Sequence, residues 1–290
     1  MKVTLIVNPI SGRGRGGEAA RRLREGLEAR GAAVETLLTR SKGEARALAA
    51  GLNGETSLVV GIGGDGTLNE IANGLGDRPV PLGVVPTGTS NVLAMDLGLP
   101  RRVEEAIPAL LAGRTRAIDV ARVNGRLAIL FVGVGFDAMV LERLERRRRG
   151  AITKWTYLPA IARALARYRG PDLRVDVDGE RFEGIALALV SNVGRYGGPF
   201  FRLDPTREVN DGLFECYLFR GRSRAALVRH GLRAMARRLR PGRSLAVRRA
   251  RRVRIESDAS VPYQVDGDLA GTTPVEIEVL PRALRLVIPA

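Results

Sequence analysis

A chain of 290 residues is long enough for about two domains, and a hydrophobic content of 45% can fill their cores. No apolar stretch approaches the roughly 20 residues that span a bilayer, and no basic-then-apolar segment opens the chain, so we expect neither a membrane span nor a leader peptide. One cysteine, Cys216, and one histidine, His230, argue against disulfides, a zinc centre and a thiol or imidazole mechanism. We expect Cys216 to be a buried structural thiol and His230 to be a surface or packing residue, in a cytoplasmic protein.

The formal net charge of +16 is almost all arginine, because Lys2, Lys42 and Lys154 are the only lysines. Arginines cluster at 146–149 and again between 220 and 254. Such a surface can bind nucleic acid or an anionic bilayer, although an arginine-rich proteome would produce the same excess on solvated helix faces. Aromatic residues make up only 4% and do not interleave with the arginines, so we expect no nucleic-acid partner.

The first 117 residues alternate strand-like and helix-like segments. The strand-like runs are 3–8, 34–39, 58–62 and 81–85, and the helix-like segments are 18–29, 43–51, 68–75 and 92–97. Buried strands that alternate with helices predict a parallel sheet covered on both faces, here a Rossmann-like nucleotide domain. Ligands of such sheets bind beyond the carboxyl ends of the strands.

Glycine-rich loops follow three of these strands, at 8–14, 63–67 and 86–91. The most informative is Gly63-Gly64-Asp65-Gly66-Thr67, because bare backbone N–H groups can approach phosphate oxygens where a Cβ would clash. The N-terminus of the following helix adds partial positive charge, and Asp65 could face a metal on the phosphates. No Gly-Lys-Ser/Thr follows, so this is not a P-loop. A tight turn with a helix cap at Thr67 is the structural alternative.

From residue 118 onward, strand-like runs joined by Asn-Gly and Asp-Gly turns predominate. The strand-like runs are 118–123, 127–134, 173–177, 185–191, 213–219 and several between 244 and 279; helix-like segments are 137–146 and 153–168, and the Asp-Gly turns are 178–179, 211–212 and 266–267. We predict an antiparallel, β-sandwich-like domain over 118–282, with a cleft between it and domain 1–117. The strand 283–290 is expected to complete the first domain.

Together the motifs resemble the diacylglycerol kinase/sphingosine kinase family of lipid kinases, in its bacterial branch, over nearly the whole chain. They are Asn8-Pro-Ile-Ser-Gly12, Gly63-Gly-Asp-Gly-Thr67 with Asn69-Glu70, Gly88-Thr-Ser-Asn91, Gly133-Val-Gly-Phe-Asp137, Asn192 to Tyr196-Gly-Gly198, Asn210-Asp-Gly-Leu213, and Val265-Asp-Gly-Asp268 with Pro281-Arg-Ala-Leu-Arg285. Gly-Gly-Asp-Gly alone also occurs in NAD kinases and phosphofructokinases. Its combination with Gly-Thr-Ser-Asn and the C-terminal Asp-Gly-Asp is specific.

The resemblance implies transfer of the γ-phosphate of ATP to a lipid hydroxyl. It implies that ATP is surrounded by Asn8, Ser11, Gly12, Thr39, Gly63, Gly64, Asp65, Gly66, Thr67, Leu68, Asn69 and Thr89. A Mg²⁺ ion would be held in the β domain by Asp211 and the backbone carbonyls of Glu208 and Leu213. Asp65 and Asp119 would form an acidic network near the phosphates. Asp268 matches the carboxylate proposed to take the proton of the substrate hydroxyl.

Two positions depart from the family pattern. Glutamate is usual where this chain has Asp268, and many bacterial members carry aspartate where it has Val92. Asp268 in an ordinary hairpin turn is the structural alternative to a base. Two other functions stay open: a soluble NAD or sugar-phosphate kinase, and a non-catalytic lipid- or nucleic-acid-binding protein. We expect peripheral docking at an anionic membrane and leave a homodimer open; no motif identifies the lipid.

Overall fold

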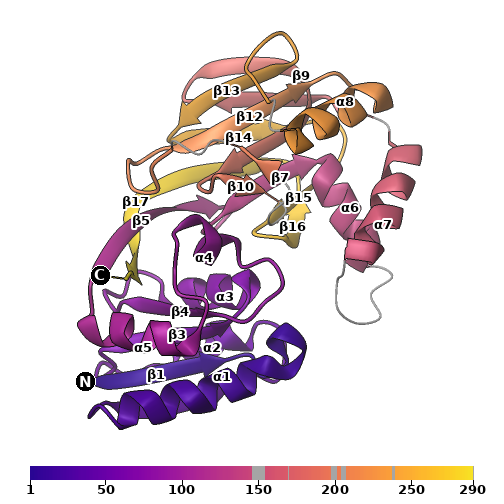
Figure 1. Cartoon of the computed structure of the whole chain (residues 1–290). Helices are drawn as coiled ribbons and strands as arrows, with labels where there is room; N and C mark the ends of the chain where they lie inside the picture. The colour runs from indigo at the N-terminus through magenta and orange to yellow at the C-terminus, as the bar shows by residue number, and fades with distance from the viewer. Residues whose placement is uncertain (146–153, 169, 197–200, 204–206, 237–238, 290) are drawn as a thin grey trace.

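The computed structural model describes residues 1–145, 154–168, 170–196, 201–203, 207–236 and 239–289 (Figure 1). The arginine cluster at 146–149, the Gly-Gly pair at 197–198 and the arginines at 237–238 lie outside the described residues. Within the described ranges, no helix combines the length and hydrophobicity needed to cross a membrane.

The N-terminal part of the chain is a parallel sheet with helices on both faces, which confirms the predicted α/β class. The strands, in spatial order, are β2 (Ala33–Leu38), β1 (Lys2–Val7), β3 (Leu58–Gly63) and β4 (Leu82–Pro86). Successive side chains of β1 point to opposite faces. Leu5 and Val7 therefore pack beneath α1 (Ser11–Glu28) and α5 (Val103–Ala112), whereas Ile6 packs beneath α2 (Glu44–Ala50) and α3 (Asp65–Leu75).

The C-terminal part is an antiparallel, sandwich-like domain built around a second apolar core, as the sequence predicts. Its strands are β5 (Thr115–Val123), β6 (Arg126–Ala128), β7 (Phe131–Gly135), β8 (Leu173–Val177), β9 (Glu180–Ser191), β10 (Arg195–Tyr196), β11 (Phe201–Arg202), β12 (Phe214–Arg220), β13 (Leu245–Ala250), β14 (Arg252–Glu256), β15 (Pro262–Val265), β16 (Asp268–Thr272) and β17 (Val275–Val287). Helices α6 (Phe136–Glu145), α7 (Lys154–Ala166) and α8 (Arg224–Met235) lie along one side of it, and α4 (Val92–Asp96) lies in the N-terminal part (Figure 1).

Strand β17 runs through both parts of the molecule (Figure 1). Ile277 to Leu280 pair antiparallel with β5, while Leu286 pairs in parallel with Leu82 of β4. The parallel and antiparallel strands thereby form one continuous sheet, apart from β10 and β11, which pair with each other in a separate two-stranded sheet. This shared strand fixes the carboxyl edge of the parallel strands relative to the β domain, and both contribute to the site.

The predicted elements differ from the observed ones in four places. Helix α3 begins at Asp65 rather than at residue 68, because Gly64 is its extended N-cap residue; Thr67 lies inside the first turn, so the cap at Thr67 is wrong. Helix α1 begins at Ser11, with left-handed residues at 12–14 before the regular helix. The run 127–134 is two strands, β6 and β7. Helix α5, which contains Pro108, was not predicted.

Three of the predicted Asn-Gly and Asp-Gly turns are confirmed as hairpins with two residues at positive φ: 124–125, 178–179 and 266–267. The fourth is wrong. Strand β12, which follows Asp211-Gly212, pairs with β9 and β13, and Asp211 does not have a positive φ.

Cys216 and His230 are both packing residues. Cys216 is buried, which raises the pKa of its thiol to about 12. His230 is buried, with a ring nitrogen 3.0 Å from the Arg220 carbonyl oxygen.

Candidate active site

Three glycine-rich loops meet at the carboxyl edge of the parallel sheet. The first follows β1, the second β3 and the third β4. The Asn8 N–H donates to the Ile62 carbonyl (2.9 Å), and the Thr87 N–H donates to the Gly63 carbonyl (2.9 Å). The Thr87 hydroxyl is also 2.9 Å from the Ser11 hydroxyl oxygen. These bonds hold all three loops in register around the N-terminus of α3.

Two glycines in these loops are required by close backbone contact. A Cβ on Gly12, whose φ is +63°, would lie 2.1 Å from the Thr87 carbonyl oxygen. A Cβ on Gly88 would lie 2.5 Å from the Gly64 Cα. Real Cβ atoms do not approach so closely, so the loops can meet only as bare backbone. Gly66, by contrast, is exposed with open space at its Cβ position, which leaves the first turn of α3 accessible to an anion.

Asp65 links the second loop to the third instead of facing open space. Its carboxylate oxygens accept the backbone N–H groups of Val92 (2.9 Å) and Leu93 (3.2 Å) at the N-terminus of α4. Burial raises the pKa of Asp65, and these hydrogen bonds oppose the rise. Val92 itself is buried in the apolar core, so the side chain that replaces the family's aspartate leaves no gap there.

The other residues predicted around ATP fall into two groups. Asn8, Ser11, Gly12, Gly64 and Gly66 are half-buried or exposed at the loop rim, and Thr89 is exposed. Thr39, Gly63, Thr67, Leu68 and Asn69 are buried. Leu68 packs in the core, and the Thr39 hydroxyl donates to the Val7 carbonyl (3.2 Å). The structure thus brings all three predicted loops together, but the buried side chains support the site rather than line it.

Asn69 joins the α/β part to the C-terminal motif. Its amide donates to Asp266 Oδ2 (2.6 Å) and to the Leu127 carbonyl (2.9 Å). Asp266 also accepts the consecutive backbone N–H groups of residues 129–131 at 2.7–2.9 Å. Burial raises the pKa of Asp266 to about 6, against these four hydrogen bonds. The sequence interpretation missed Asp266 because its partners lie 135 to 197 residues away in the chain.

Asp268 closes the hairpin turn and is not one of its two central residues. The positive-φ turn residues are Asp266 and Gly267, whereas Asp268 begins β16 and pairs with Val265. Its carboxylate is 2.7 Å from Lys42 Nζ and 3.3 Å from an Arg126 guanidinium nitrogen. Lys42 follows β2 at the edge where the phosphate-type loops lie, so Asp268 stands beside those loops. Arg126, which also donates to the Asn69 side-chain oxygen (3.1 Å), was missed by the sequence interpretation.

Asp119 organises the predicted metal loop, not the phosphate loops. It is fully buried, and its oxygens accept the backbone N–H groups of Gly212 (2.6 Å) and Arg282 (2.7 Å). In that loop, Asp211 accepts the Leu213 N–H (3.0 Å) and forms an ion pair with Arg249. The Glu208 and Leu213 carbonyls and the Asp211 carboxylate would offer a metal only oxygen donors, the kind of ligand that Mg²⁺ prefers. Arg249 is exposed enough to leave the carboxylate, so the residues fit a metal that competes with it.

A buried polar cluster lies where α4 meets the β domain. Asp96 accepts an Arg207 guanidinium N–H (2.9 Å) and the Gly194 backbone N–H (3.0 Å). Glu215 lies 4.0 Å from Arg207, and one of its buried oxygens has no hydrogen-bond partner. Burial raises the pKa of Glu215 to about 7. No motif in the sequence indicated this cluster.

Comparison with known families identifies the protein family to which this fold and its three glycine-rich loops belong. Residues 2–123 match the model of the diacylglycerol kinase catalytic domain, and residues 130–288 match that of the YegS C-terminal NAD kinase beta sandwich-like domain. The chain belongs to this diacylglycerol kinase family and is a kinase.

Individual relatives are similar to this chain over nearly its full length. The chain is 30% identical to a diacylglycerol kinase of Mycobacterium tuberculosis, across 99% of this chain and 95% of the relative. It is 29% identical to a diacylglycerol kinase of Bacillus subtilis, across 99% and 96%. A crystal structure of a diacylglycerol kinase from Bacillus anthracis has the same fold, with a TM-score of 0.76 at 22% identity, covering 99% of this chain and 96% of that one.

Proposed function

We propose that this chain transfers the γ-phosphate of ATP to the hydroxyl of a diacylglycerol-like lipid at a membrane surface. The observation that carries this proposal is the position of Asp268. Its carboxylate projects from the β domain to Lys42 (2.7 Å), at the edge of the sheet where the three glycine-rich loops meet. A candidate base and a candidate phosphate site therefore lie at the same edge of the sheet.

ATP phosphates are assigned to the loop rim. The exposed turn at Gly66 and the N-terminus of α3 offer N–H donors and partial positive charge to the phosphate oxygens. Ser11 and Thr89 add hydroxyl groups at the edges of the same rim. Asp65 keeps α4 against α3 and so preserves the spacing between the second and third loops. Phosphoryl transfer depends mostly on such positioning.

The acceptor hydroxyl loses its proton as its oxygen bonds to phosphorus. Asp268 is the group we assign to take that proton. Lys42 and Arg126, which contact its carboxylate, provide positive charge beside the transferring phosphoryl group. A Mg²⁺ ion bound by Asp211 with the Glu208 and Leu213 carbonyls would supply further positive charge and hold this loop in place.

A lipid acceptor is supported by the relatives named diacylglycerol kinase over more than nine-tenths of their lengths. The test is ATP-dependent phosphorylation of diacylglycerol in neutral detergent micelles, with phosphatidic acid as the measured product. Parallel reactions with NAD and with sugar phosphates provide the comparison. Phosphorylation of diacylglycerol alone supports the proposal; a soluble acceptor used in preference to the lipid contradicts it.

A further inference from the structure

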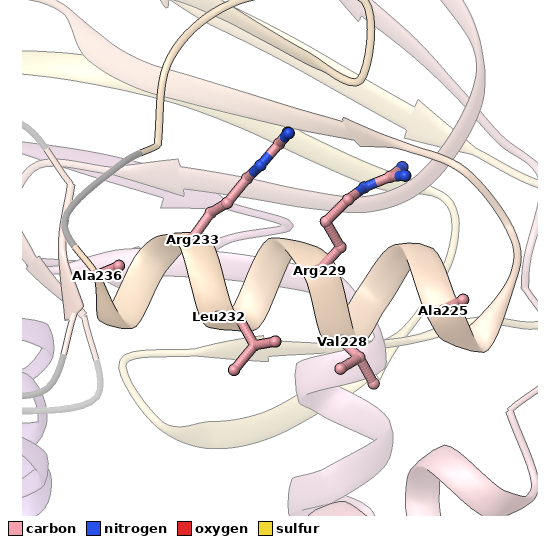
Figure 2. A pocket seen from close by; sticks show the side chains of 6 residues that line it. All are labelled: Ala225, Val228, Arg229, Leu232, Arg233 and Ala236. Atoms are coloured by element: carbon pink, nitrogen blue, oxygen red, sulfur yellow. The ribbon is translucent and has the colours of Figure 1, made fainter.

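Helix α8 exposes an apolar stripe along its outward face. Val228, Leu232 and Met235 follow one another at intervals of four and three residues, so they lie on one side of the helix. Their exposed fractions are 43%, 62% and 61%. Ala225 and Ala236 extend the stripe, and Figure 2 shows Val228 and Leu232 pointing away from the helix on the same side. This stripe is not needed for folding, because other residues hold the helix to the domain.

The opposite face of α8 provides that attachment. Ala226, Leu227, His230 and Ala234 are all buried. The His230 ring packs edge-on against Phe219 of β12, with ring centroids 5.1 Å apart. The helix therefore has two apolar faces, one covered by its own domain and one uncovered.

Arginines border the uncovered stripe on both sides. At 100° per residue, Arg224 falls on one edge of the stripe, and Arg229 and Arg233 fall on the other. Figure 2 shows the last two pointing away from Val228 and Leu232. Among the described residues, none of these three arginines has a carboxylate partner within ion-pair distance. The sequence contains no Asp or Glu from Cys216 to Ile255, so nothing in this segment neutralises them.

We propose that this face of α8 docks on an anionic bilayer. An apolar stripe bordered by arginines is the arrangement of a helix that lies in the plane of a membrane interface. Leu232 and its neighbours would enter the boundary between headgroups and acyl chains, while Arg224, Arg229 and Arg233 would contact lipid phosphates. The proposal rests on the proposed lipid kinase function, since it identifies the surface that brings the enzyme to its substrate.

A second copy of the chain suits this face less well than a bilayer does. In a twofold-symmetric dimer the same patch lies on both sides of the interface, so the arginines that border one stripe would lie near those of the other. Like charges oppose such an association. Anionic headgroups would instead neutralise the arginines.

The test is co-sedimentation of the full-length protein with vesicles, without ATP or diacylglycerol. The vesicles are pure phosphatidylcholine or equimolar phosphatidylcholine and phosphatidylglycerol. Leu232→Gln is paired with Leu38→Gln, which changes an exposed leucine of β2 in the other domain. Arg229→Gln is paired with Arg101→Gln, an exposed arginine before α5.

We expect the wild type to bind the anionic vesicles in preference to the neutral ones. Leu232→Gln should lower the partition coefficient about tenfold, and Arg229→Gln about fivefold with a weaker dependence on salt. Both control variants should bind like the wild type. All variants should phosphorylate diacylglycerol normally in neutral detergent micelles, because none of the substituted residues belongs to the proposed catalytic site.

Equal binding of Leu232→Gln and Leu38→Gln would overturn the α8 proposal, even if micellar activity showed that the lipid kinase function is right. Loss of a solution dimer in the α8 variants, without vesicle binding by the wild type, would also overturn it in favour of a second copy. The expected vesicle binding without kinase activity on any lipid would leave α8 as a docking face and refute the proposed function.

Discussion

Replacing Asp268 with asparagine separates a catalytic role from a structural one. Asparagine has nearly the same size, and its side-chain oxygen can still accept a hydrogen bond from Lys42 or Arg126. It cannot accept the proton of the acceptor hydroxyl. The side chain lies after the two central residues of the hairpin turn, at the first residue of β16, so the turn itself is unchanged.

The expected magnitudes for activity and stability differ widely. General base catalysis contributes roughly 10²–10⁴ in rate, which corresponds to about 3–5 kcal/mol in the activation barrier. The ion pairs of Asp268 are partly exposed, with side-chain exposures of 24% for Asp268, 60% for Lys42 and 31% for Arg126. Such pairs contribute about 0.2–1 kcal/mol each to the free energy of unfolding. The kcat should therefore fall by two to four orders of magnitude, about 10²–10⁴-fold, with a change of only a few degrees in Tm.

The assay measures kcat, the KM for ATP and Tm for Asp268→Asn and Asp268→Glu on micellar diacylglycerol. The KM for ATP should stay near the wild-type value in both variants. Asp268→Glu keeps a carboxylate and should retain substantial activity. A kcat for Asp268→Asn within a few-fold of the wild type would refute the assignment of the base, whatever the result for glutamate.

Three further predictions follow from carboxylates of the site and its surroundings. In Asp65→Asn, the new side-chain NH₂ group would face one of the two backbone N–H groups that the Asp65 carboxylate accepts. Phosphoryl transfer should therefore be lost, and the free energy of unfolding should fall by about 1–3 kcal/mol. Normal turnover at saturating Mg²⁺ would contradict this. Without nucleotide, Mg²⁺ should raise the Tm of the wild type, more so in Arg249→Gln and not in Asp211→Ala; equal shifts in all three would exclude a metal at Asp211. Glu215, whose pKa is raised from 4.5 to about 7, favours folding when protonated, so that contribution is complete below pH 4.5 and is lost as the pH rises through 7. Relative to Glu215→Gln, the wild type should lose about 3 kcal/mol of stability between pH 4.5 and 8, and parallel curves would contradict the burial of this charge.

Features set by local sequence could be predicted before the structure was known. Strand β3 is a continuous apolar run that ends at Gly63, and only bare backbone allows the close approach of the next residue, Gly64, to Gly88. The Asp266-Gly267 pair predicted a hairpin because both residues tolerate positive φ. The resemblance to the family followed from the combination of Gly-Gly-Asp-Gly with Gly-Thr-Ser-Asn and the C-terminal Asp-Gly-Asp.

Contacts between distant segments could not be predicted in this way. Asn69 and Asp266 are 197 residues apart, and long-range pairings such as that of the shared strand β17 bring their parts of the fold together. The same holds for Arg126 and Asp268, 142 residues apart. Asp65 was predicted to face a phosphate-bound metal because its loop suggested phosphate binding. In the structure, its carboxylate instead accepts backbone N–H groups of α4. A carboxylate's partner depends on the packing around it.

We propose that this kinase phosphorylates a lipid hydroxyl at a site containing Asp268. The most direct test is transfer of radiolabelled phosphate from ATP to a total lipid extract, with the labelled product identified by mass spectrometry. Wild type and Asp268→Asn are run in parallel at equal folded concentration. We predict a labelled lipid with the wild type, in which a hydroxyl has become a phosphate, and little or none with the variant. A wild-type enzyme that labels only water-soluble molecules, or a variant that labels lipid as fast as the wild type, would contradict the account.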